Sequence, residues 1–81
     1  MSKIIKRIDK NVLEEVIIQL TNFKGKDLID IRIWIKPLPT EEGESKPTKK
    51  GVCLGISAIP DLIEGLKEAL RASEAISGGE K

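Results

Sequence analysis

A chain of 81 residues allows one small domain, and its 14 basic and 13 acidic side chains leave a net charge of +1, which does not by itself indicate a nucleic-acid-binding protein. One cysteine and no histidine exclude a disulfide framework and a structural metal site of the usual spacing, and no cofactor is predicted. Because a domain of this size buries only about 60% of its unfolded surface, we expect a homodimer.

Residues 1–13 are basic and partly apolar, and Ile4, Ile5 and Ile8 fit either a short strand or an ordered arm. The segment lacks the apolar core of a signal peptide, and no run approaches the ~20 apolar residues that cross a bilayer. Together with one free thiol, these features predict a cytoplasmic, nucleoid-associated protein, or a nuclear one in a eukaryote, with no membrane contact.

A first clear strand is predicted from Glu15 to Phe23, because apolar and polar residues alternate there with a period of two. Its polar-face positions are Gln19, Thr21 and Phe23. Lys24-Gly25-Lys26 then predicts a tight turn, since glycine accepts a positive φ without steric cost.

A second strand is predicted from Asp27 to about Lys36, with the clearest alternation in the chain. One face carries the isoleucines Ile29, Ile31, Ile33 and Ile35. The other face carries Asp30, Arg32, Trp34 and Lys36. Because β-branched residues at alternate positions fit a pleated surface packed on one side, we expect the isoleucines to be covered.

Residues 37–45 are rich in Pro, Gly and acids and predict a loop. Residues 46–56 predict one or two short strands. A helix then begins with Ser57 as its N-cap and ends at Ser77, before two glycines and a tail over 78–81. Leu and Ile residues form one stripe along this helix at helical spacing.

These elements give an α+β fold, with several antiparallel strands followed by one C-terminal helix. The domain is expected over residues 14–77, with residues 1–13 as an N-terminal arm or short strand. One sheet face is expected to pack against the helix. The opposite face, which carries Phe23, Arg32 and Trp34, is left without a helix to cover it.

The single Phe and single Trp of the chain, Phe23 and Trp34, both lie among basic residues. Aromatic rings interleaved with cations suit a surface that stacks bases and neutralises phosphates. Other interpretations stay open, since Phe23 also suits a core cap, and Trp34 also suits a dimer contact or a ring folded over its own sheet.

Candidates for phosphate contacts flank the strands at their turns. They are Lys24, Lys26, Lys46, Lys49 and Lys50. Each lysine that pairs with a single-strand phosphate steepens the salt dependence of binding by about 0.7, whereas a solvated surface lysine does not. Lys49 and Lys50 directly precede Gly51, where the backbone can approach closely.

No arrangement of residues predicts catalysis. Cys53 is expected to be a small buried strand residue, and the chain has no histidine to activate it. Asp27 and Asp30 fall on opposite faces of their strand. The chain is therefore predicted not to be an enzyme.

Several motifs follow one another in a distinctive order and spacing. They are Phe23-Lys24-Gly25-Lys26, Ile29-Asp30-Ile31-Arg32, an aromatic residue, an acidic loop, Lys46-Pro47 and Lys49-Lys50-Gly51, before a strand and a Leu-rich helix. From about Val16 to Leu70, the chain thereby resembles the C-terminal domain of the positive cofactor four transcriptional coactivators.

The resemblance implies a four-stranded antiparallel sheet and a helix in a two-fold homodimer whose helices contribute to the interface. We place that interface at Leu62, Leu66, Ala69 and Leu70, where small residues also permit close approach. It further implies a channel for single-stranded or melted DNA. The matching contact positions are Phe23, Lys24, Lys26, Arg32, Lys49 and Lys50, to which Thr21, Trp34 and Lys46 are added from their places in the strands.

The chain departs from the family pattern in three ways. The family's DNA-stacking Trp aligns with Ile35, whereas Trp34 lies one residue earlier, so either a bulge shifts the ring or Trp34 acts from the other face. The loop 37–45 is longer than usual. The family's regulatory N-terminal region, rich in Ser and Lys, is absent, which favours a compact bacterial, archaeal or viral relative.

We therefore predict a homodimeric, largely sequence-independent single-stranded DNA-binding protein in transcription, replication or repair. Transcription or replication proteins are further candidate partners. One alternative is a protein-interaction module of the transcription machinery, anchored by Phe23 and Trp34. Another is a binder of single-stranded RNA.

Overall fold

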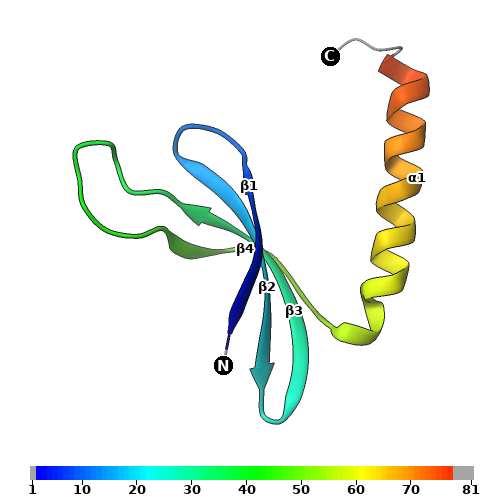
Figure 1. Ribbon diagram of the computed structural model, residues 1–81, viewed down its shortest axis with the longest axis horizontal. Coiled ribbons are helices and arrows are strands. Elements are labelled where there is room, and N and C mark those ends of the chain that lie inside the picture. The colour runs from blue at the N-terminus through cyan, green and yellow to red at the C-terminus, as the bar shows by residue number, and fades with distance from the viewer. Residues whose placement is uncertain (1, 78–81) are drawn as a thin grey trace.

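The computed structural model describes residues 2–77 and shows four strands followed by one helix (Figure 1). The elements are β1 (Lys3–Asp9), β2 (Glu14–Phe23), β3 (Lys26–Ile35), β4 (Lys46–Gly55), the 3₁₀ turn η1 (Ile56–Ala58) and α1 (Ile59–Ser77). The α+β class, with its antiparallel sheet and C-terminal helix, is confirmed. The predicted tail, 78–81, lies outside the described residues.

The sheet is an antiparallel meander with strand order β1-β2-β3-β4. Of the two possibilities for the N-terminal segment, the strand is the one observed, because β1 pairs with β2 along the sheet edge. Residues 46–55 form one strand rather than two. Within the described part of the chain, no helix is long and apolar enough to cross a membrane.

The pairing of β2 with β3 assigns every side chain to a face, because it runs without interruption from Glu14 opposite Ile35 to Phe23 opposite Lys26. Paired residues share a face of the sheet. The isoleucine face carries Val16, Ile18, Leu20, Ile29, Ile31, Ile33, Ile35, Val52 and Leu54. The arginine face carries Arg7, Glu15, Ile17, Thr21, Phe23, Asp30, Arg32 and Trp34. The alternation predicted for β2 and β3 is therefore confirmed.

The helix does not cover the isoleucine face of its own chain. Ile35 and Val52 are each 50% exposed, and Leu66 and Leu70 on α1 are each 61% exposed. Figure 1 shows α1 standing apart from the sheet, to which it is joined through η1. The expectation that the helix packs on the sheet is wrong within one chain, because the short turn after β4 directs the helix away.

The arginine face, expected to be open, holds three of the four buried residues in the described part of the chain: Ile17, Asp30 and Glu15. Ile17 lies between Arg7 and Arg32 in the strand register. Arg7 forms an ion pair with Glu15 at 2.9 Å, and Arg32 forms one with Asp30 at 2.7 Å. The apolar stems of the two arginines cover Ile17, so this face is closed by its own ion pairs.

Two smaller expectations also need correction. Cys53 is exposed rather than buried, because β4 is an edge strand without a covering layer. Ser57 lies inside η1, and α1 begins at Ile59, so Ser57 is not its N-cap. Pro60 and Asp61 do fall in the first turn of α1, where a missing N–H costs no hydrogen bond and a negative charge is favourable.

Candidate nucleic-acid interface

The turn between β2 and β3 presents an aromatic ring beside cations. Lys24 and Gly25 have positive φ angles of 53° and 81°, as a two-residue hairpin turn requires. The Asn22 side chain supports the turn, because its Oδ1 accepts a hydrogen bond from the Gly25 N–H at 3.2 Å. Phe23 is 61% exposed, and Lys24 Nζ lies 5.3 Å from its ring centroid. Phe23 thus does not cap the core of this chain.

A second group of cations lies on β4, where pairing with β3 is irregular. Arg32 pairs with Gly51 and Trp34 pairs with Pro47, so residues 48–50 all lie opposite Ile33. We call residues 48–50 the β4 bulge. The Thr48 hydroxyl donates to the Ile33 carbonyl at 2.8 Å and accepts from the Lys50 N–H at 3.1 Å. These bonds replace ladder hydrogen bonds that the bulge interrupts.

The β4 bulge is followed by a glycine, Gly51, which no other residue can replace unless the backbone of β3 moves. Gly51 has a φ of 154°. A Cβ at this position would lie 2.4 Å from the Ile31 carbonyl oxygen and 2.6 Å from Arg32 Cα. The close backbone approach expected next to Lys49 and Lys50 is therefore present, and it is made by β3.

Arg32, a predicted phosphate contact, already holds a carboxylate. Its Nε donates to both oxygens of Asp30 at 3.1 Å, and its Nη2 donates to Asp30 Oδ1 at 2.7 Å. Its Nη1 donates to the Thr48 carbonyl of the β4 bulge at 3.1 Å. The hydrogen bonds to Asp30 raise the pKa of Arg32 above its usual value. Only 24% of the Arg32 side chain is exposed.

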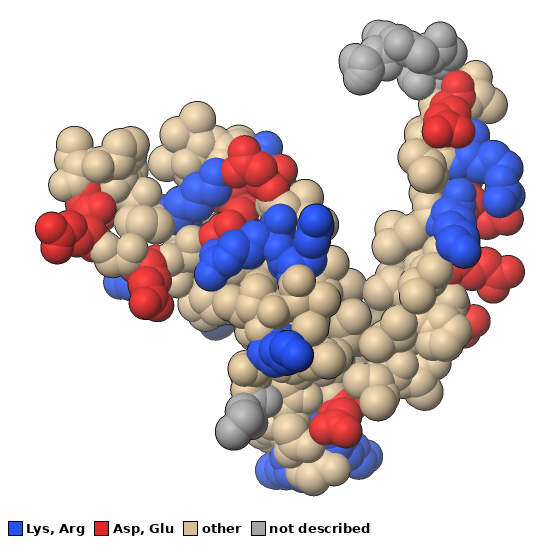
Figure 2. Space-filling view, in the orientation of Figure 1, with Lys and Arg blue, Asp and Glu red and all other residues tan. Residues whose placement is uncertain are grey.

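The predicted lysines differ from Arg32 because their ammonium groups are not engaged in ion pairs within the described chain. Lys24, Lys26, Lys46, Lys49 and Lys50 are all exposed, and none forms an ion pair with another residue of the described chain. Arg7, Lys10 and Lys36 are each paired with an acid. Figure 2 shows Lys and Arg side chains over the sheet, with Asp and Glu side chains beside several of them. The five lysines therefore keep their charge available for an external anion.

The lysines do not share one environment. Lys46 lines a hollow together with Glu41, Glu42 and Glu44 of the β3–β4 loop, which weakens the positive potential there. Lys50 lines a shallow apolar hollow that includes Val16, Ile31 and Ile33. The strongest unopposed charge thus lies at the turn and at the β4 bulge.

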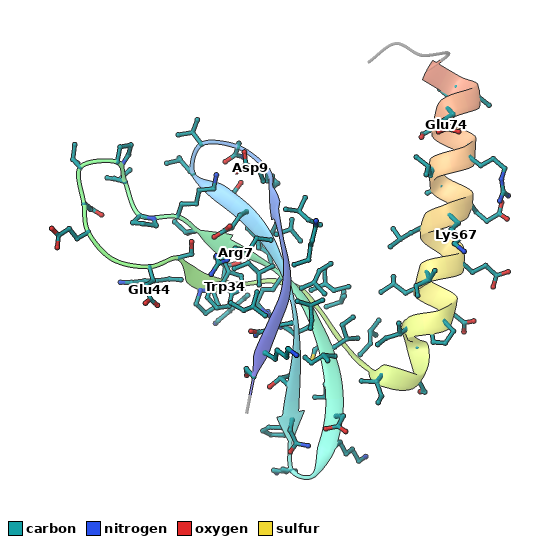
Figure 3. All side chains as sticks on the ribbon, in the orientation of Figure 1. Arg7, Asp9, Trp34, Glu44, Lys67 and Glu74 are labelled. Atoms are coloured by element: carbon teal, nitrogen blue, oxygen red, sulfur yellow. The ribbon has the colours of Figure 1, made fainter. Side chains whose placement is uncertain are left out.

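Trp34 keeps the face that the alternation predicts. The irregular pairing lies on β4, whereas the register between β2 and β3 is uninterrupted. Trp34 therefore lies opposite Glu15 on the arginine face, and Ile35 lies on the isoleucine face. Trp34 is half-buried, and its Nε1 is buried without a hydrogen-bond partner in the described chain. Figure 3 shows Trp34 near Arg7 on the sheet. Its ring is less accessible than that of Phe23.

Phe23 and Trp34 lie at opposite ends of the β2–β3 hairpin. Phe23 pairs with Lys26, and Trp34 is eight residues further along β3, which corresponds to about 26 Å. The two rings therefore do not contact the same base. Thr21, also predicted at the site, is half-buried and accepts a hydrogen bond from the Ser2 hydroxyl at 3.1 Å.

The predicted interface residues of α1 present an apolar surface. Leu66 and Leu70 are 61% exposed, Ala69 is exposed and Leu62 is half-buried. Among residues 2–77, no group of three or more His, Cys, Asp or Glu side chains is placed to hold a metal ion.

Sequence reasoning missed two residues that shape the site, Asp30 and Thr48. Asp30 occupies Arg32, and Thr48 holds the β4 bulge to β3 through both its hydroxyl and its carbonyl. The Asp-x-Arg spacing, which places both side chains on one strand face, was the available signal for the first. No local pattern indicates the second.

Comparison with known proteins identifies one family. The family model described as Transcriptional Coactivator p15 (PC4) matches residues 13–65, a segment that includes the turn and the β4 bulge. The orthorhombic crystal structure of a PC4 homolog from Burkholderia pseudomallei is 23% identical, with a TM-score of 0.78, covering 86% of this chain and 90% of that chain.

The tetragonal crystal form of the same homolog is 22% identical, with a TM-score of 0.73, covering 85% of this chain and 97% of that chain. At these identities, the likeness of the structures shows the shared fold. No curated protein matches the chain.

Proposed function

This chain belongs to the PC4 family of transcriptional coactivators, and we propose that it is a homodimer that binds single-stranded DNA with little sequence preference, in transcription, replication or repair. One observation carries the proposal. An exposed aromatic ring, Phe23, and five exposed lysines without ion pairs in the described chain border the same two-strand unit, β3 and β4. Stacking rings and free cations are the two components of sequence-tolerant strand binding.

The arrangement suggests how a strand would lie. Ile33, which lies opposite the β4 bulge, comes seven positions after Lys26 along β3, so the turn and the bulge are about 23 Å apart. A strand that spans both would exchange counterions for lysines at each end, while a base stacks on Phe23. None of these contacts reads base edges, so little sequence preference is expected.

A second copy of the chain fits the apolar surface that the monomer exposes. The radius of gyration is 15.2 Å, against about 12 Å for a compact domain of this length. The accessible surface is 6563 Å², against about 4,800 Å² for a compact monomer of this mass. The excess of about 1,800 Å² is enough for a stable interface, with the isoleucine face and the α1 stripe as its apolar components.

Titration of a fluorescent single-stranded oligonucleotide tests the binding proposal, with the matching duplex and single-stranded RNA as competitors at two salt concentrations. We expect salt-sensitive binding that single-stranded DNA competes and duplex does not. Phe23→Ala should weaken it by roughly 5- to 150-fold, the loss of one stacked base. Leu38→Ala, which removes another exposed apolar side chain (45% exposed) away from the turn, is the control.

Three outcomes would contradict this assignment. An absence of binding at low salt would reject it. Stronger competition by RNA than by DNA would favour an RNA-binding role. Full binding by a correctly folded Phe23→Ala variant would reject stacking at the turn and favour Phe23 as a protein contact.

Sedimentation equilibrium tests the homodimer. Leu66→Gln removes an apolar side chain from the α1 stripe and should shift the protein toward monomer. Lys67→Gln changes the neighbouring position, which Figure 3 shows on α1, and should leave the dimer intact. A monomeric wild-type protein, or an equal shift in both variants, would contradict the proposed interface.

A further inference from the structure

We propose that Asp30 and Arg32 act together as a latch that fixes the β4 bulge and thereby positions Lys49 and Lys50 for the strand. In this role Arg32 is a positioning residue, and the phosphates are bound by the lysines. The inference rests on the proposed single-stranded DNA binding and assigns different tasks to the basic residues of that site.

The geometry of the guanidinium supports the latch. Two nitrogens of Arg32, Nε and Nη2, are committed to the Asp30 carboxylate, and Nη1 reaches across to the Thr48 carbonyl. Bidentate pairing of this kind orients the planar guanidinium as well as holding it. The Asp30 side chain is only 7% exposed, so the anchor of the latch is rigid and shielded from competing water.

The β4 bulge needs such support because its pairing with β3 is irregular. Residues 48–50 lie opposite one residue of β3, so the regular ladder cannot hold them. Two hydrogen bonds that involve side chains join the segment to β3: the Thr48 hydroxyl donates to the Ile33 carbonyl, and the Arg32 guanidinium donates to the Thr48 carbonyl. Loss of the guanidinium removes the bond that joins the bulge to a buried group.

The other arginine of this face shows that the arrangement is specific. Arg7 pairs with Glu15 at 2.9 Å and flanks Ile17 on the side opposite Arg32. Its partner Glu15 also accepts a hydrogen bond from Ser45 of the loop. The Arg7 guanidinium donates to Glu15 and not to the β4 bulge. Arg7 is therefore a matched control that covers the same core residue without holding the bulge.

Asp30→Asn separates the latch from direct phosphate binding by Arg32, because the two roles predict opposite signs. If Arg32 contacted phosphate directly, removing the Asp30 charge would free the guanidinium, raise the local potential and strengthen binding. If the latch operates, the same change loosens the β4 bulge and weakens binding.

The experiment measures single-stranded oligonucleotide affinity for wild type, Asp30→Asn, Arg32→Gln and Arg7→Gln, with circular dichroism to verify the fold. At 0.1 M salt, a lost phosphate contact costs roughly fivefold. We expect Asp30→Asn and Arg32→Gln each to weaken binding by about 5- to 25-fold, as one or both bulge lysines are misplaced, and Arg7→Gln to bind as wild type does. In a Lys49→Ala, Lys50→Ala background, Arg32→Gln should have no further effect.

A readout without DNA keeps the latch testable if the wild-type protein does not bind. The backbone amide resonances of Lys49 and Lys50 should shift in Asp30→Asn and Arg32→Gln, and stay in place in Arg7→Gln. If Arg32→Gln does not fold, Arg32→Lys replaces it, because lysine keeps the charge without the guanidinium fork and should still shift both amides.

Stronger binding by Asp30→Asn, a further loss from Arg32→Gln in the double-lysine background, or unchanged Lys49 and Lys50 amides would overturn the latch. Failure of the wild-type protein to bind at low salt would instead reject the proposed function, and the amide shifts would still decide whether the latch exists.

Discussion

The two places where this chain presents free cations are built in different ways. The β2–β3 turn is formed by adjacent residues, with positive φ angles at Lys24 and Gly25 and a side-chain bond from Asn22. The β4 bulge is held by residues 15 and 16 positions away, through Ile33 and Arg32 on Thr48. A local turn tolerates changes elsewhere in the sheet, whereas a bulge held by another strand moves when that strand is altered.

Gly51→Ala should have the largest effect, because the new Cβ would fall on backbone atoms of β3, 2.4 Å from the Ile31 oxygen. Backbone cannot yield as a side chain does, so we expect a loss of stability on the order of 3 kcal/mol. Urea denaturation at fixed protein concentration measures it.

Gly43→Ala is the matched control for this change. Gly43 also has a positive φ, 134°, but a Cβ there meets no atom within 4 Å. The loss of stability in Gly43→Ala should be clearly smaller than that in Gly51→Ala. Equal losses in the two variants would mean that the φ angle, rather than the close approach of β4 to β3, makes Gly51 necessary.

Thr48→Val should have the next largest effect. Valine keeps the shape of threonine but leaves the Ile33 carbonyl without its donor and the Lys50 N–H without its acceptor, for a loss of about 1–2 kcal/mol. Asn22→Ala removes the corresponding support of the turn at an exposed site, and should cost less than about 1 kcal/mol. The same denaturation assay compares them, and the reverse order would contradict the distinction between the two regions.

Lysine substitutions compare the two regions in binding. Lys24→Ala and Lys49→Ala should each lower the slope of log affinity against log salt by about 0.7, and weaken binding about fivefold at 0.1 M salt. Lys67→Ala on α1 is the control of equal charge change. A slope that changes at only one region would show that the strand does not span both.

A substitution at Glu14, next to the β1–β2 connection, should change stability least. This connection, like the β2–β3 turn, is formed by residues that are close in sequence. Hydrogen bonds, from Lys10 first and then from Asn11, lower the pKa of Glu14 from its ordinary value of 4.5. A carboxyl group whose pKa is lower in the folded state stabilises the fold at pH values above its pKa in the unfolded chain. This contribution to stability is lost as the pH falls through the pKa of the folded state.

Glu14→Gln should therefore be slightly less stable than wild type at pH 7, and the difference should vanish in acid. Denaturation midpoints measured from pH 7 to pH 3 check this sign. A difference that grows as the pH falls would contradict it.

Much of the fold followed from the alternation of residues, because a strand buries every second side chain. The two central strands were predictable in this way, the Lys-Gly-Lys turn from the conformational freedom of glycine, and the helical stripe from its helical spacing. The faces of Ile33 and Trp34 were also predictable, since two extra residues on β4 leave the parity of β3 unchanged. The exposure of the two faces was not, because it depends on the Arg7 and Arg32 ion pairs that lie over Ile17.

The same division holds for the candidate site. Residue types and spacing determined which side chains could contact a nucleic acid, including Phe23 and the five lysines, because charge and aromatic character belong to the residues themselves. Only the tertiary structure decided which of them are free. Trp34 is half-buried, α1 stands away from its own sheet, and Arg32 donates to the Thr48 carbonyl of β4, because these features depend on which elements become neighbours. The pairing of Arg32 with Asp30 is different, since both residues lie on β3 and their spacing already placed them on one face.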